Sequence, residues 1–147
     1  MKAQIIAMLL SAGLLAGCAT PYRPGNVEKN LTVNLDLQDG SALTLSGAAL
    51  GVNYVGKDCS NDYRGYVDLV QGANEVGIPV GQRTLLIVEV GQRTLGSRSA
   101  MQRGAAFTPK PGARYRIDAS YVDTMFDFRL YEVTRAGKRE LPVGNEC

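Results

Sequence analysis

The segment Leu31–Gln38, LTVNLDLQ, decides the fold class because apolar and polar residues alternate along it without interruption. In an extended chain Leu31, Val33, Leu35 and Leu37 lie on one face, and the polar residues between them lie on the other. A period of two over this length indicates a β-strand with one buried and one solvated face. The segments on either side of this strand show related patterns.

A turn signal follows the strand. Asp39-Gly40 is a dipeptide favoured in two-residue hairpin turns, and Leu43 and Leu45 resume the alternation. The sequence therefore predicts a hairpin over this region. For the Ala-rich stretch Ser41–Leu50 a turn of helix is the alternative, and it is the one exception to the strand pattern after the N-terminal region.

Further strand-like runs recur about every ten residues along the chain. They are residues 52–55, 66–70, 76–80, 84–90, 114–121 and 125–134. Thr84–Val90 is apolar on both faces, which indicates a central strand, whereas Arg114–Tyr121 alternates and should bury its two tyrosines. The expected fold is all-β, a single antiparallel β-sandwich or small barrel over residues 31–147.

The N-terminal region has the layout of a secretory signal peptide over residues 1–17, with Lys2 ahead of the apolar run Ile5–Leu15. The residues at the end of the run, Leu15-Ala16-Gly17-Cys18, resemble the lipobox of Gram-negative bacterial lipoproteins. The resemblance implies cleavage before Cys18 and acylation of its thiol. The alternative is an ordinary secretory signal in which Cys18 has no role.

The lipobox resemblance also implies a location. Ala19 follows Cys18 where an Asp would favour retention in the inner membrane, so the expected location is the outer membrane, facing the periplasm. Two or more acyl chains give stable anchoring. The membrane would thus be contacted through the lipid on Cys18. Pro21, Pro24 and Gly25 predict that residues 18–30 form a lipidated flexible tether.

Two further cysteines are present, Cys59 and Cys147. With Cys18 acylated, an oxidising periplasm favours a disulfide between them, and two free thiols are the alternative. No metal site is expected, because the chain has no histidine and no third available cysteine.

The residue types exclude several function classes. Without histidine a Ser-His-Asp triad is impossible, and no glycine-rich nucleotide loop occurs, so neither an enzyme nor a cofactor is expected. A net charge of +2 on 147 residues argues against nucleic-acid binding. The carboxylate pairs are expected to be solvated; they are Asp58 with Asp62 and Asp123 with Asp127. Tyr54, Tyr63 and Tyr66 offer a modest stacking surface near Cys59, and half-buried tyrosines of a sheet are the alternative.

Basic residues gather in Gly81–Arg116, where seven Lys or Arg accompany Glu89 as the only acid. Within it the sequence GQRTL occurs twice, at residues 81–85 and 91–95, a spacing that predicts successive strands entered through equivalent turns. The predicted binding residues are Arg83, Arg93, Arg114 and Arg116. Together they would bind the carboxylates or phosphates of another envelope protein, the cell wall or lipopolysaccharide. Solvated strand-end arginines are the alternative.

Two segments resemble known families. Phe107–Asp118 (FTPKPGARYRID), with Ile78–Gly81 before it, is similar to uncharacterised β-sandwich lipoproteins of Gram-negative envelopes. Gly112–Tyr115 (GARY) resembles a segment of membrane-bound C-type lysozyme inhibitors, although Pro111 precedes it and no Trp strand follows. The expected function is a non-catalytic envelope binding or scaffold module. The alternatives are a periplasmic protein inhibitor and an accessory lipoprotein of a secretion or envelope assembly.

Overall fold

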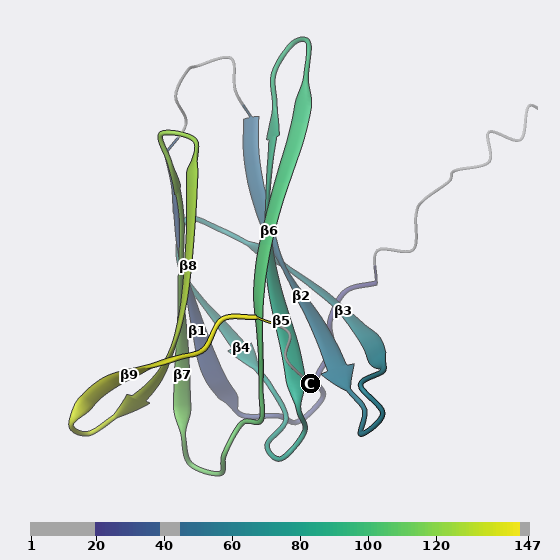
Figure 1. Ribbon diagram of the computed structural model, residues 1–147, viewed down its shortest axis with the longest axis vertical. Helices are drawn as coiled ribbons and strands as arrows, with labels where there is room; N and C mark the ends of the chain where they lie inside the picture. Colours follow the sequence, from purple (N-terminus) through teal and green to yellow (C-terminus); the bar gives the residue numbers. More distant parts are fainter. Residues whose placement is uncertain (1–19, 39–44, 145–147) are drawn as a thin grey trace, which may run out of the picture.

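The computed structural model describes residues 20–38 and 45–144, which form two β-sheets packed as a sandwich (Figure 1). The all-β fold is confirmed, and the two sheets of these residues do not close into a barrel. The strands of the first half are β1 (Lys29–Leu37), β2 (Leu45–Val55), β3 (Asn61–Leu69) and β4 (Gly72–Gly77). The strands of the second half are β5 (Thr84–Arg93), β6 (Arg98–Phe107), β7 (Arg114–Val122), β8 (Met125–Thr134) and β9 (Gly137–Leu141). The described residues contain no helix that could cross a bilayer.

One sheet has the order β4-β1-β7-β8-β9 and the other the order β3-β2-β5-β6. Among the described strands all pairs are antiparallel except β1 with β7, which run parallel from Leu31 opposite Tyr115 to Leu37 opposite Tyr121. The apolar strand β5 lies between β2 and β6, as its two apolar faces predict.

Two local predictions are wrong. β1 does not form a hairpin with β2, because the two strands belong to different sheets and both edges of β1 are taken by β4 and β7. The predicted turn Asp39-Gly40 lies outside the described residues. Within Ser41–Leu50, residues 45–50 are strand rather than helix, because β2 hydrogen-bonds on both sides with β3 and β5.

The core lies between the sheets and is built from the alternating faces that the sequence shows. On β7 the four inward residues Tyr115, Ile117, Ala119 and Tyr121 are all buried, which confirms the predicted pattern. The most deeply buried large side chains are Leu31, Leu50, Ile78, Leu86, Ile117 and Leu130. Burying a side chain of this size contributes about 1.5–3 kcal/mol.

The N-terminal segment from Thr20 to Tyr22, here called the N-terminal strap, packs on the sandwich instead of belonging to a free tether. Tyr66 on β3 donates its N–H to the Thr20 carbonyl at 2.9 Å, and the Tyr22 N–H donates to the Tyr66 carbonyl at 2.8 Å. The Tyr22 ring is buried, and its hydroxyl donates to the Gly77 carbonyl on β4 at 2.9 Å. The strap therefore joins the outer strands of the two sheets and closes one open side of the sandwich.

Within the predicted tether, residues 18–30, Thr20–Tyr22 dock on β3 and β4, and Lys29 and Asn30 belong to β1. Asn30 is buried and exchanges two 2.9 Å hydrogen bonds with the backbone of Ile78. The prolines exclude regular structure but do not prevent an extended segment from docking. At the other open side Gly144 pairs with Ala105 on β6, and Figure 1 shows the yellow C-terminal segment crossing there from β9.

Candidate functional site

The structure does not assemble the four predicted arginines into one surface. Arg83 immediately precedes β5 and Arg93 ends it, so the two GQRTL copies flank one strand rather than begin two. Ten residues of strand separate these arginines by roughly 33 Å. The prediction of equivalent strand starts is wrong, because a ten-residue spacing also fits the two ends of a single long strand.

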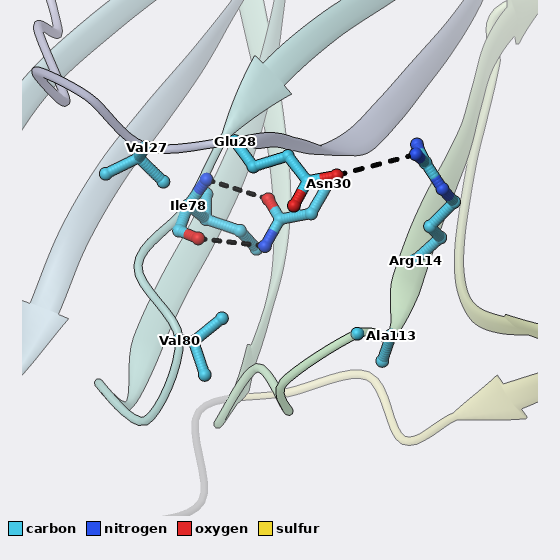
Figure 2. Close-up of a pocket in the computed structure, with 8 residues that line it drawn as sticks. Val27, Glu28, Asn30, Ile78, Val80, Ala113 and Arg114 are labelled. Atoms are coloured by element: carbon cyan, nitrogen blue, oxygen red, sulfur yellow. Dashed lines mark hydrogen bonds and ion pairs between the residues drawn. The ribbon is translucent and has the colours of Figure 1, made fainter.

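Arg114 and Arg116 lie on β7 in the other sheet, and both have acidic partners. The Arg114 guanidinium lies 3.6 Å from Glu28 and also donates to the Lys29 carbonyl at 3.4 Å. Figure 2 shows this ion pair beside a small cavity of about 160 Å³ at the end of the sandwich. Arg116 Nε lies 2.6 Å from Asp118 Oδ1.

Ion pairs continue across the outer face of this sheet. Lys138 on β9 lies 4.0 Å from Asp118, and Arg129 on β8 lies 3.3 Å from Asp127 and 4.0 Å from Glu140. Asn34 on β1 also donates to Asp118 at 3.1 Å. The charges of this face are therefore compensated within the sheet, which leaves it little net attraction for an anionic polymer.

The outer face of the other sheet, β3-β2-β5-β6, carries a groove of about 420 Å³, here called the tyrosine groove. Its residues come from all four strands. They are Ala49, Gly51, Asn53, Tyr63, Tyr66, Asp68, Ile87, Glu89 and Gln102.

Small residues on the second strand of the sheet form the groove. Ala49 and Gly51 on β2 form the bottom of the groove because their side chains are small or absent. The residues paired with them on the neighbouring strands β3 and β5 have larger side chains, which form its walls. In the register of the sheet, Ala49 on β2 lies between Asp68 on β3 and Glu89 on β5. Gly51, two residues further along β2, lies between Tyr66 on β3 and Ile87 on β5. Neighbouring strands are about 4.8 Å apart, so the Cα atoms of Asp68 and Glu89 lie roughly 10 Å apart on opposite walls.

The polar side chains of the tyrosine groove face solvent and are not paired with other side chains of the described residues. Within the described part of the chain, none of its six polar residues makes a side-chain hydrogen bond or an ion pair. Two are carboxylates, two are amides and two are tyrosines, of which Tyr63 is 51% exposed. The groove thus offers two negative charges, hydrogen-bonding amides and aromatic faces that attract cations.

The sequence points to part of this groove. The predicted stacking surface includes its residues Tyr63 and Tyr66, whereas Tyr54 lies under the Arg64 guanidinium, 4.9 Å from its ring centre, and packs against the core. Sequence reasoning missed Asp68, Glu89 and Gln102. The signal that could have found them is the run of small residues on the solvated face of β2, which leaves space beside larger neighbours.

The structure places several of the other predicted positions. Cys59 is disulfide-bonded, while Cys18 and Cys147 lie outside the described residues, so the Cys59–Cys147 pairing stays a prediction. Asp58 accepts a 2.6 Å hydrogen bond from the Ser60 hydroxyl, and Asp62 pairs with Arg64. Tyr115 of the GARY segment is 2% exposed and is a core residue, so it cannot contact another protein.

Comparison with known proteins identifies no relative from which a role for the groove could be transferred. No protein-family model matches the chain, and no curated protein matches it either. In the described ranges, residues 20–38 and 45–144, no three Cys, Asp or Glu side chains gather as they would around a metal ion.

Proposed function

We propose that this protein is a non-catalytic binding module of the bacterial envelope, anchored to the periplasmic side of the outer membrane by lipid on Cys18. The sequence Leu15-Ala16-Gly17-Cys18 supports the anchor. The tyrosine groove is the binding surface, and its ligand is a basic segment of another envelope protein.

One observation carries the choice of ligand. The two outer faces differ in electrostatic compensation: the face with Arg116 and Asp118 pairs its own charges, whereas Asp68 and Glu89 in the tyrosine groove do not. A Lys or Arg side chain between the groove walls would meet two carboxylates and the Tyr63 and Tyr66 rings. The cell wall and lipopolysaccharide, considered as ligands of the basic stretch, carry anionic groups that these carboxylates would repel.

Peptide binding tests the groove directly. A fluorescent hexapeptide rich in Lys and Arg should bind the purified domain, and an Asp- and Glu-rich hexapeptide should not. Binding should weaken as salt rises, because the Debye length falls to about 8 Å at physiological ionic strength. The double variant Asp68→Asn/Glu89→Gln should lose at least about tenfold in affinity, corresponding to two exposed charge contacts of about 0.7 kcal/mol each.

A second variant fills the groove without altering its charge. A Cβ at Gly51 would lie 3.7 Å from the nearest atom, the Ile87 carbonyl oxygen, which is an ordinary contact, and the methyl groups of Gly51→Val would project into the groove. Gly47→Val is the matched control, because Gly47 lies on the same face of β2 outside the groove and its Cβ would meet nothing within 4 Å. Equal affinities for these variants would refute the groove as the binding surface.

The anchor has its own test. Cys18→Ser removes the only thiol in the lipobox and should leave the protein unprocessed and absent from washed outer membranes. Retention of Cys18→Ser on outer membranes through high-salt washing would refute lipid anchoring without bearing on the peptide measurements.

A further inference from the structure

The N-terminal strap fixes where the anchor meets the folded domain. Thr20 and Tyr22 are hydrogen-bonded to the two backbone groups of Tyr66, at 2.9 and 2.8 Å. Gly65 has φ +128°, and a Cβ there would lie within 2.8 Å of backbone atoms of Thr20, Pro21 and Tyr22. The strap is therefore seated against β3 at a position that only glycine allows.

Only one residue separates Cys18 from Thr20 in the chain. Two residues of extended chain span at most about 7 Å, whatever conformation they adopt. Pro21 lies opposite Tyr66, so the Cα of Thr20, one residue earlier, is about 6 Å from the Cα of Tyr66, and the Cα of Cys18 lies within roughly 13 Å of it. Tyr66 is also a wall of the tyrosine groove.

From this placement, and resting on the proposed acylation of Cys18, we propose that the β3 side of the sandwich lies against the lipid headgroups, with the tyrosine groove opening beside the membrane surface. A long tether would let any side of the domain approach the bilayer, whereas a linker of this length keeps the strap side nearest to it. The basic segment bound in the groove would accordingly belong to a protein at the same membrane surface.

Two exposed residues on this side suit a headgroup layer. Arg23 follows the strap and is exposed, and Tyr63 on β3 exposes half of its surface. Arginine binds phosphate, and tyrosine favours the membrane–water interface, where its ring is in an apolar layer and its hydroxyl is hydrated. The opposite outer strands, β6 and β9, would face away from the bilayer.

Tryptophan fluorescence can measure this orientation, because the chain contains no tryptophan. Tyr63→Trp places a single probe on the β3 side. Leu95→Trp is the matched control at the 91% exposed tip of the β5–β6 hairpin, which Figure 1 shows extending away from the strap. Ile87 lies in register with Tyr66 through Gly51, and β5 continues for six residues beyond it, roughly 20 Å, before the turn that contains Leu95.

The acylated, full-length variants are reconstituted into vesicles that contain a lipid with a nitroxide on its headgroup. The Tyr63→Trp variant should lose most of its emission, and the Leu95→Trp variant should keep it. A Gly-Ser insertion of about twenty residues between Ala19 and Thr20, with a root-mean-square span of about 25 Å, should restore the emission of the first variant.

The outcomes separate the two proposals. Equal quenching of both probes on an acylated, vesicle-bound protein would overturn the orientation and leave the anchor intact. Quenching that persists after the insertion would also overturn the orientation, because the short linker would then not be its cause. A chain recovered without acyl groups, as mass spectrometry would reveal, overturns the anchor and the orientation together.

Discussion

The close packing of Gly65 on β3 against the backbone of the N-terminal strap predicts how a substitution at Gly65 changes the stability of the fold. Gly65→Ala places a Cβ 2.6 Å from the Thr20 carbonyl oxygen and 2.7 Å from the Tyr22 nitrogen, and neither backbone atom can rotate away. The strap must leave β3. Gly72→Ala is the control, because Gly72 also has a positive φ, +93°, but a Cβ there meets nothing within 4 Å.

The expected cost follows from the interactions that hold the strap on the sandwich. Releasing the strap removes two backbone hydrogen bonds of about 1 kcal/mol each. It also exposes Tyr22, now 9% exposed, whose burial contributes about 1.5–3 kcal/mol. Backbone strain alone costs both variants about 1–2 kcal/mol. We therefore expect Gly65→Ala to lose about 5–7 kcal/mol and Gly72→Ala about 1–2 kcal/mol.

Urea unfolding followed by circular dichroism measures the free energies of unfolding of the two variants and the parent. Because the strap does not touch the Gly72 site, the difference between the variants isolates strap docking from backbone strain. Equal destabilisation of the two variants would refute the conclusion that the strap is part of the folded domain.

Two further predictions concern the disulfide and acid stability. Cys147→Ser should leave Cys59 with a free thiol and lower the free energy of unfolding by about 4 kcal/mol, the value for a disulfide that closes a loop of this length. Thiol labelling and peptide mapping measure the state of Cys59. An intact disulfide at Cys59 in this variant would contradict the predicted pairing. Partial burial raises the pKa of Asp118, but hydrogen bonds from Arg116 and Asn34 outweigh it and hold that pKa below its ordinary value. Its stabilising contribution is therefore present above about pH 4 and is lost as the pH falls through the lowered folded-state pKa. Urea unfolding across this range should show a shallower acid decline for Asp118→Asn than for the parent, and parallel declines would contradict this role.

The sequence by itself determined the strands and the faces they bury. The alternation in Leu31–Leu37 and in Arg114–Tyr121 predicts which side chains lie inside, and the burial of Tyr115 and Tyr121 confirms it. The doubly apolar Thr84–Val90 likewise predicts an interior strand. These are local properties, because successive side chains of an extended chain point to opposite faces whatever the strand pairs with.

Only the tertiary structure decided which strands pair and which side chains share a surface. β1 pairs with β4 and β7 rather than with the strand that follows it, so the local turn signal at Asp39-Gly40 did not determine the partner. Pairing depends on contacts between residues far apart in the chain, which no local period records. The same long-range pairing places Asn34 and Lys138 beside Asp118, and it brings Asp68 and Glu89 to opposite walls of one groove.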